Sequence, residues 1–436
     1  MTINLYKHQT DVLEQTKEKN RVAYYLDMGL GKTFVGSEKA KELGKHILVV
    51  CQKSKVDDWY KHFDELYDCH LYDLTRKKDF DKYCDDIKTP KWKDTTTLMV
   101  AVINYDLIFR RKELSQLIDY TLMLDESSLI QNETSKRASF ILRKLFPSNV
   151  ILLSGTPTSG KYEKLWSQCR LLGWRITKTD FYRRYVVEED LCNWAGLKIL
   201  TPYGSPIKKV VGYKNVKELK ENLRYYGAVF MKTDEVLELP EQNFVEIDVD
   251  ESTAYRKFKR DKIIDVGNNI LVGDTSLTEL LYSRQLCGHY NKKKLDTFKD
   301  LVNSTDDRLI VFYNFNDELA ELQRLVDKPI STFNGASKDL TAYETYDNSV
   351  TFIQYQSGSM GINLQLANKI IYFTPPLSSE LFEQSKKRIH RIGQSKKCFY
   401  YKLTCGVEKN IYNALDKKRD YTDALFQEEK HLRKIL

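Results

Sequence analysis

Ten short apolar runs constrain the fold of this 436-residue chain more than any other feature. They are rich in β-branched residues, and each is followed by polar or helix-like sequence. Continuous apolar runs that alternate with helical stretches indicate parallel strands buried on both faces by βαβ units. The runs form two sets of five, at residues 21–28, 46–52, 98–105, 120–126 and 149–156, and at residues 308–315, 329–335, 350–357, 369–375 and 398–404.

Two sets of strands predict two doubly wound α/β domains, which agrees with the usual domain size of about 100–200 residues. Residues 160–300 lie between the sets and contain few strand-like runs, so we expect a mainly helical insert and a linker there. The sequence therefore predicts a first sheet domain, a helical insert with the end of that domain, a linker with a further helical insert, and a second sheet domain. Their expected bounds are 1–160, 161–240, 241–300 and 301–436.

The composition is that of a folded soluble protein, with 42% hydrophobic and 30% charged residues. No apolar run approaches the ~18 residues that a membrane span needs. The N-terminal stretch MTINLYKHQTDVLEQ lacks the apolar segment of a secretory signal. We therefore expect a cytoplasmic protein without a membrane partner, in which the eight cysteines are reduced.

The stretch YYLDMGLGKT has the order strand, loop and helix that a phosphate-binding loop requires. The usual pattern has a further glycine five residues before Gly31, where this chain has Leu26. Backbone N–H groups of such a loop point at the phosphates. Lys32 would reach the β- and γ-phosphate oxygens, and the Thr33 hydroxyl would ligate Mg²⁺.

A second candidate element is LMLDESS, in which a buried strand ends in two carboxylates. Ligands bind at the carboxyl ends of parallel strands. Asp125 would hold Mg²⁺ through water, and Glu126 would orient the attacking water. The alternative is an ordinary acid pair at the end of a strand.

Two further stretches carry residues suited to phosphate chemistry. In ILLSGTPTSG a strand ends in the hydroxyls of Ser154 and Thr156, which can sense a γ-phosphate and relay its state. In EQSKKRIHRIGQ, Arg388 and Arg391 lie three residues apart, which puts them on one face if the segment is helical, and Gln384 lies one turn before Arg388. Two arginines directed at one anion suit the charge of a phosphoryl-transfer transition state.

The order of these motifs resembles the superfamily 2 helicases, and within them the Snf2-like (SWI2/SNF2) DNA translocases in a minimal, phage- or bacterial-type form. The similar segments are DMGLGKT, DESS, LSGTPT, QSGSMGINLQLA, RIHRIGQ and the adenine-recognition segment LYKHQTDVL, and they extend over nearly the whole chain. The resemblance implies two RecA-like domains and an ATP hydrolase that uses Mg²⁺. The implied nucleotide contacts are Tyr6, Gln9, Met28, Gly29, Leu30, Gly31, Lys32, Thr33 and Gly361.

The resemblance also implies DNA contacts, made by backbone amides and small polar side chains that grip phosphates without reading sequence. The implied contacts are Lys53, Ser54, Asn104, Tyr105, Asn314, Phe315, Ser357, Gly358 and Asn363. The chain departs from the family pattern at residues 230–233, where an Arg-rich string is usual, and at residues 374–377, where a Trp-Asn pair is common. The inserts are short, which makes nucleosome remodelling a poor expectation.

The function predicted from these features is an ATP-dependent DNA motor that moves along duplex DNA and remodels or regresses branched structures. The alternative is a helicase that separates DNA or RNA strands with a wedge such as Trp194, the turn at 203–206 or the Tyr225–Tyr226 pair. A nucleotide-gated adaptor that barely hydrolyses ATP is a third hypothesis, and the intact acids and arginines argue against it.

The net charge of +8 permits nucleic-acid binding. Seven Lys or Arg residues lie between 386 and 402 without an acid, and seven between 208 and 232 against two. The expected partners are duplex or branched DNA and replication or recombination proteins. We expect a monomer in the cytoplasm of a bacterial or phage-infected cell.

Overall fold

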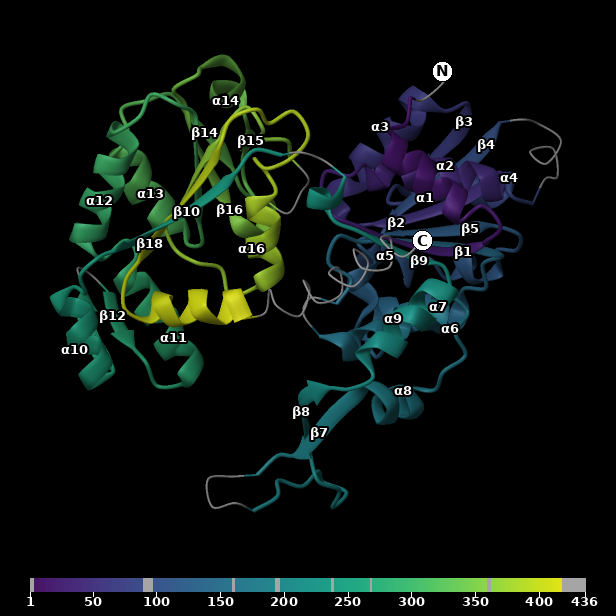
Figure 1. The fold of residues 1–436 in the computed structure, drawn as a ribbon, viewed down its shortest axis with the longest axis horizontal. Helices are drawn as coiled ribbons and strands as arrows, with labels where there is room; N and C mark the ends of the chain where they lie inside the picture. The colour runs from purple at the N-terminus through teal and green to yellow at the C-terminus, as the bar shows by residue number, and fades with distance from the viewer. Residues whose placement is uncertain are drawn as a thin grey trace. The chain divides into compact units, whose positions relative to one another are not determined.

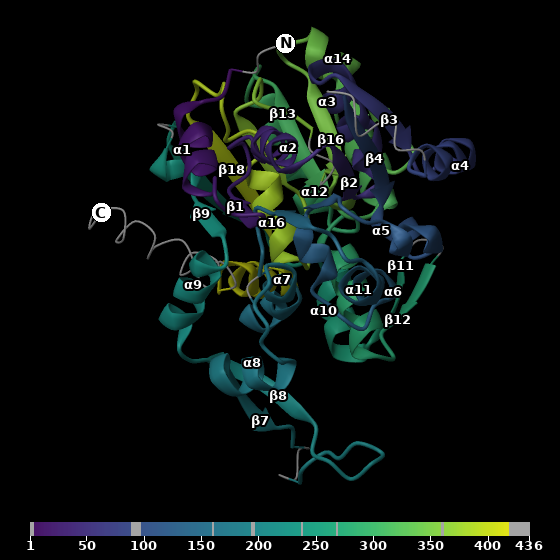
Figure 2. The same ribbon diagram turned by 90° about the vertical axis from the view of Figure 1, so that its right-hand side faces the viewer.

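A computed structural model describes residues 4–88, 97–158, 161–192, 197–236, 239–266, 269–358 and 362–417. The chain divides into two compact units, Met1–Val236 and Leu237–Asp420 (Figures 1 and 2). Within the described residues, no helix is long and apolar enough to cross a membrane. Each unit is built on its own seven-stranded sheet.

The sheet of the first unit is entirely parallel, in the order β3-β4-β2-β5-β6-β1-β9. Five of its strands are the predicted apolar runs. The other two, β3 and β9, were not predicted, and they occupy the two edges of the sheet. The strands are β1 (Arg21–Leu26), β2 (His46–Cys51), β3 (Cys69–Asp73), β4 (Leu98–Asn104), β5 (Thr121–Asp125), β6 (Asn149–Leu153) and β9 (Ala228–Met231).

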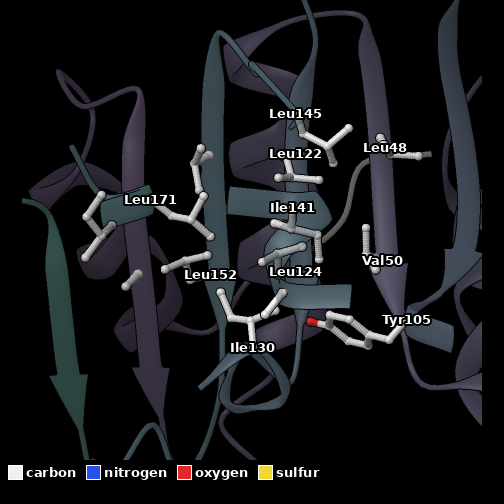
Figure 3. Close-up of a cluster of buried hydrophobic side chains, with 14 of the residues drawn as sticks. Leu48, Val50, Tyr105, Leu122, Leu124, Ile130, Ile141, Leu145, Leu152 and Leu171 are labelled. Atoms are coloured by element: carbon white, nitrogen blue, oxygen red, sulfur yellow. The ribbon is translucent and has the colours of Figure 1, made fainter. Parts of the chain in front are cut away.

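Helices cover both faces of this sheet. Successive strand residues point to opposite sides, so the continuous apolar runs place buried side chains on both faces. On one face, Gly36 of α2 lies so close to Met123 and Leu153 that an added Cβ would stand 2.9–3.1 Å from their side chains. On the other face, the alternate residues Leu122 and Leu152 pack with α6 (Figure 3). The helices that precede the insert are α1 (Lys7–Gln15), α2 (Lys32–Leu43), α3 (Val56–Leu66), α4 (Lys77–Asp86), α5 (Tyr105–Ile108) and α6 (Lys136–Lys144).

The segment between β6 and β9 is less helical than the sequence predicted. It contains α7 (Trp166–Leu171), α8 (Lys178–Tyr185) and α9 (Val216–Tyr225), but also an antiparallel pair, β7 (Val186–Asp190) and β8 (Lys208–Tyr213). The β7–β8 pair was missed because its residues are mostly exposed and lack a continuous apolar run. This segment belongs to the first unit, and β9 returns the chain to the sheet beside β1.

The sheet of the second unit has the order β10-β18-β17-β13-β16-β14-β15 and is parallel except for the β14–β15 pair. Its five predicted runs are strands of this sheet. Its strands are β10 (Gln242–Asp248), β13 (Leu309–Tyr313), β14 (Ile330–Phe333), β15 (Lys338–Asp339), β16 (Val350–Gln354), β17 (Lys369–Tyr372) and β18 (Cys398–Thr404).

The segment 241–300, for which the sequence predicted a linker with a helical insert, contains helices and belongs to this second unit. Strand β10 pairs with β18 at the edge of the sheet, and the small pair β11–β12 packs with α10 and α11 in a core of its own. The remaining elements of the unit are α10 (Thr253–Asp261), β11 (Ile263–Val266), β12 (Asn269–Val272), α11 (Ser276–Cys287), α12 (Lys292–Asn303), α13 (Asn316–Arg324), α14 (Thr341–Thr345), α15 (Tyr355–Gly358) and α16 (Ser379–Lys386).

Candidate nucleotide site

The loop between β1 and α2 has the backbone geometry of a phosphate cradle. Gly29 and Gly31 have φ values of 88° and 73°, in the left-handed region that glycine adopts without strain. A Cβ on Gly31 would stand 2.0 Å from Gln9 Nε2, so only glycine fits between the loop and α1. The open backbone and the N-terminus of α2 fit the phosphates of a nucleotide.

Gln9 of α1 supports this loop through a side-chain hydrogen bond. Its Nε2 donates a hydrogen bond to Leu30 O at 3.2 Å, and its Oε1 accepts one from Tyr6 N at 2.9 Å. Tyr6 is 55% exposed and stacks on His8, so its ring remains accessible for an adenine. The Gln9 amide is therefore bound to the protein backbone on both of its ends.

Lys32 lies at the carboxyl end of β1. Its Nζ donates to Leu26 O at 2.9 Å and to Asp27 O at 3.2 Å. A Cβ on Gly155 would stand 3.4 Å from the same Nζ, which places the LSGTPT turn directly against the lysine. The loop and the end of β6, 123 residues apart, therefore meet at one point.

Asp125 ends β5 beside this point. Trp59 Nε1 on α3 donates a hydrogen bond to Asp125 Oδ2 at 2.8 Å. Burial raises the pKa of Asp125, and the Trp59 bond with the charges of Lys55 and Lys32 opposes that rise. The half-buried carboxylate of Asp125 at the end of β5 and the hydroxyl of Thr33 in the first turn of α2 are oxygen donors of the kind that fits Mg²⁺, and they are the residues that would hold it.

Glu126 has a φ of 56°, which is uncommon for a non-glycine residue, and this backbone turn is followed by the short helix η4 (Ser127–Ile130). Ser154 Oγ donates to Glu126 Oε1 at 2.6 Å, and Ser128 Oγ donates to the same oxygen at 3.1 Å. Thr156 Oγ1 is buried without a hydrogen-bond partner among the described residues. Ser154 thus links the DESS and LSGTPT segments directly.

Thr233 explains one departure from the family pattern. Residues Phe230 and Met231 belong to β9, and Thr233 Oγ1 just after it donates to Asp27 Oδ2 at 3.1 Å. It also lies 3.3 Å from Met28 O. Residues 230–233, which stand where the Arg-rich string is usual, therefore connect the start of the β1–α2 loop to the edge strand β9 by hydrogen bonds.

In the second unit, the two arginines of the RIHRIGQ segment do not lie on a helix, so the condition for a shared helical face is not met. Helix α16 carries Gln384 and ends at Lys386, and Arg388 and Arg391 follow in turns. Gln394 fixes these turns, because its Nε2 donates to Ala367 O at 2.7 Å and to Ile389 O at 3.2 Å. Burial lowers the pKa of Arg391.

Residues 12–292 match the SNF2-related domain family, and residues 293–393 match the helicase conserved C-terminal domain. The chain belongs to the SNF2-related family. This confirms the resemblance that the motifs indicated and the two-domain α/β fold, and ATP hydrolysis is the enzyme class that the family implies.

Several curated proteins are similar to this SNF2-related chain. A putative ATP-dependent helicase/translocase YwqA of Bacillus subtilis is 24% identical over 73% of the chain and 37% of its own length. The DNA repair and recombination protein RAD26 of Saccharomyces cerevisiae is 24% identical over 71% and 32%. The chain thus spans about a third of the length of these two relatives. The uncharacterized ATP-dependent helicase YqhH of Bacillus subtilis is 24% identical over 94% of the chain and 77% of its own length.

Among solved structures, the Sulfolobus solfataricus SWI2/SNF2 ATPase core in complex with dsDNA has a TM-score of 0.42 to this chain. It is 18% identical, and the match covers 98% of this chain and 92% of that one.

The predicted DNA contacts of the SNF2-related chain differ in accessibility. Lys53 and Asn363 are exposed, and Ser54 and Phe315 are half-buried. Asn104, Tyr105 and Ser357 are buried, and the Tyr105 hydroxyl donates to Asp125 O at 2.9 Å. Tyr105 therefore supports the carboxylate strand from a buried position. Gly358 ends α15, and Gly361, the predicted nucleotide contact, lies outside the described residues.

Asn314 is also bound within the protein. Its Nδ2 donates to Thr374 Oγ1 at 2.9 Å and to Pro375 O at 3.0 Å, and Thr374 Oγ1 donates to Glu318 Oε2 at 2.9 Å. The residues that replace the common Trp-Asn pair therefore hold the Asn314 loop in place.

Gln168 on α7 is a residue that sequence reasoning missed. Its Oε1 accepts hydrogen bonds from Tyr25 Oη at 2.9 Å and from Ser127 Oγ at 2.8 Å, and its Nε2 donates to Pro157 O at 2.9 Å. Gln168 therefore joins β1, the DESS turn and the LSGTPT turn through its side chain. No short motif marks it, because α7 lies in the insert.

Gln168→Ala is expected to lower the free energy of unfolding by about 3 kcal/mol, because two buried hydroxyls and a carbonyl lose their partner. Urea unfolding followed by circular dichroism measures the change. Gln15→Ala, an exposed glutamine of α1, is the control and should have almost no effect. A change below about 0.5 kcal/mol for Gln168→Ala would refute its bridging role.

Proposed function

We propose that this chain is an ATP-dependent DNA motor that couples ATP hydrolysis to movement along duplex DNA. One observation carries the proposal: Lys32, Asp125 and the Ser154–Glu126 hydrogen bond come from three separate segments and lie at the carboxyl edge of one parallel sheet. This is the edge at which α/β proteins bind ligands. The family match supports the same reading.

The residues have distinct roles in the proposed reaction. The loop amides and Lys32 hold the β- and γ-phosphates, and the Tyr6–Gln9 segment takes the adenine. Thr33 and Asp125 hold Mg²⁺, which neutralises phosphate charge when bound. Glu126 orients the attacking water, and Ser154 holds the Glu126 carboxylate in position. Thr156 Oγ1 is a buried hydroxyl available to the γ-phosphate end of the nucleotide.

Arg388 and Arg391, with Gln384, are proposed to stabilise the charge of the transferring phosphoryl group. They belong to the second unit, whereas the phosphate loop belongs to the first. The phosphate loop of the first unit would then bind ATP, whereas its hydrolysis would require the arginines of the second unit as well. This dependence is the proposed source of movement.

DNA is the proposed track, in agreement with the relative RAD26, which is named a DNA repair and recombination protein. Exposed Lys53 and Asn363 are the most accessible of the predicted backbone contacts. Remodelling of branched DNA, action as a monomer in the cytoplasm, and cooperation with replication or recombination proteins are further parts of the proposal.

Strand separation is the alternative function, and Tyr203 is the observation in its favour. Its side chain is 95% exposed in the turn before β8, as a wedge requires, and Tyr225 is 73% exposed. Tyr226 is less suited, because its ring stacks on Trp174 at 5.5 Å. The third candidate wedge, Trp194, lies outside the described residues.

A comparison of nucleic acids tests the proposal. ATP turnover should rise most with duplex or branched DNA, and less with single-stranded DNA or RNA. On the best activator, a translocase displaces a third strand from a triplex but does not separate the duplex. Duplex unwinding, abolished by Tyr203→Ala, would instead establish the helicase. Turnover unaffected by any nucleic acid would refute both functions.

A further inference from the structure

The insert of the first unit carries a projecting arm, here the described residues 186–192 and 197–213, which include β7 and β8. In both views it extends away from the sheet beyond α8 (Figures 1 and 2). The arm is ordered by its own backbone. Ile199 N donates to Leu191 O at 2.8 Å, and Ile207 N donates to Ile199 O at 2.8 Å, so three segments lie side by side before β8.

The base of the arm is fixed to the unit by hydrogen bonds. Tyr213 Oη donates to Glu163 Oε2 at 2.6 Å, and Tyr185 Oη donates to Glu218 Oε1 at 2.6 Å. Lys214 N donates to Tyr185 O at 3.0 Å. The arm therefore has a defined position relative to α8 and α9, and a ligand bound at its base would be held by the whole unit.

Nearly all the net charge of the chain lies in the insert. Residues 154–227 contain 14 Lys or Arg and 7 Asp or Glu, a net charge of +7 out of +8 for the whole chain. Several of the carboxylates are already paired within the insert, as in the Asp190–Lys198 and Glu218–Arg184 ion pairs. A local positive excess on an otherwise neutral chain is the electrostatic footprint of a polyanion-binding surface.

A pocket of about 510 Å³ opens between α8 and the arm. Four cationic side chains line it, together with Tyr182, Val186, Thr179 and the single carboxylate of Glu188; the cations are Lys178, Arg183, Lys208 and Lys214. Glu188 lies 4.0 Å from Lys208, and Lys178 pairs with Glu133. Lys214 is exposed and forms no ion pair with any residue that the structure describes.

We propose that this pocket binds the phosphate backbone of the DNA on which the motor moves, as a second grip apart from the motif residues. The inference rests on the proposed function, since it assumes a DNA track. Cations on both walls suit a phosphate, and the hydroxyl-bearing Thr179 and Tyr182 suit its oxygens. Contacts of these side chains to phosphate would be independent of sequence. A grip on the insert keeps the first unit on DNA while the nucleotide changes.

The two faces of the arm supply a matched test. Lys208 lines the pocket, whereas Lys209, the next residue of β8, points to the opposite face and does not. The pocket variant is Lys208→Ala/Lys214→Ala, and the control is Lys209→Ala/Lys217→Ala. All four lysines are exposed and both variants remove the same charge, so thermal unfolding should match the wild type.

Binding of a fluorescent duplex of mixed sequence is measured from ~50 to ~200 mM salt. The pocket variant should lower the slope of log K against log salt by about 1–2, at ~0.9 for each phosphate that the protein no longer neutralises, and the control should leave it unchanged. An equal change in both variants, or in neither, would overturn the proposal. Wild-type protein that binds no DNA would refute the proposed function itself, which separates the two failures.

Discussion

Lys32→Ala is expected to lower ATP turnover by a factor on the order of 10² to 10³, the usual cost of removing a preorganised donor from a developing charge. In the structure its ammonium group lies at the end of β1, held by Leu26 O and Asp27 O and adjacent to Gly155. An alanine at this position leaves the γ-phosphate without the cation that the loop supplies. Steady-state phosphate release with saturating duplex DNA measures the change in turnover.

DNA binding should persist in this variant, because the phosphate loop and the proposed DNA surfaces are separate. Lys41→Ala is the control, since Lys41 is an exposed lysine in the last turn of the same helix α2. Its turnover should equal that of the wild type. Undiminished turnover in Lys32→Ala would show that the GLGKT loop does not hold the reacting phosphates.

The central strands could be predicted from the sequence because burial on both faces leaves an unbroken apolar run. Residues 46–52 and 350–357 are examples, and both form strands, β2 and β16. The edge strands β3 and β10 could not be found in this way. These two strands are partly exposed, as Phe244 and Val245 of β10 show at 44% and 37%, whereas the missed edge strand β9 is buried but only four residues long. For the same reason the sequence did not show that the second sheet begins with β10, within the segment for which it predicted a linker with a helical insert.

The candidate site was predictable where chemistry requires a fixed residue type at a fixed position. Lys32, Asp125 and Ser154 each follow a buried strand, and parallel topology brings such strand ends to one edge. The supporting residues carry no such signal. Trp59 acts through one hydrogen bond to Asp125, and Gln168 acts through three, to Tyr25, the DESS turn and the LSGTPT turn. Only tertiary packing selects these two residues.

The sequence could not show which predicted contact residues are engaged in hydrogen bonds within the fold. Tyr105 and Asn314 were assigned to DNA because of their places in the motif order. Their polar atoms are instead bound to Asp125 O and to the Thr374–Pro375 segment. A residue type suited to binding phosphate is equally suited to holding a loop, and only the structure separates the two uses.

Arg391→Ala is expected to lower ATP turnover by about 10³-fold or more, the scale of an arginine that stabilises a phosphoryl-transfer transition state. Nucleotide binding should be largely kept, because the phosphate loop of the first unit is untouched. Two features favour this assignment. Burial lowers the pKa of Arg391, so its charge is held partly out of water, where a cation interacts more strongly with an anion. The turn that carries it is fixed by Gln394, so the guanidinium is supported by the fold.

The matched control is Arg324→Ala, which removes an exposed arginine of α13 that pairs with Glu321. Its turnover should remain at the wild-type level. Single-turnover hydrolysis and fluorescent-nucleotide binding, measured on the same samples, separate weaker transition-state stabilisation from weaker nucleotide binding. If Arg391 acts on the transition state, the rate falls while the nucleotide affinity stays. A rate within twofold of the wild type would remove Arg391 from the reaction, whereas a parallel decrease in nucleotide affinity would make it a ground-state binding residue.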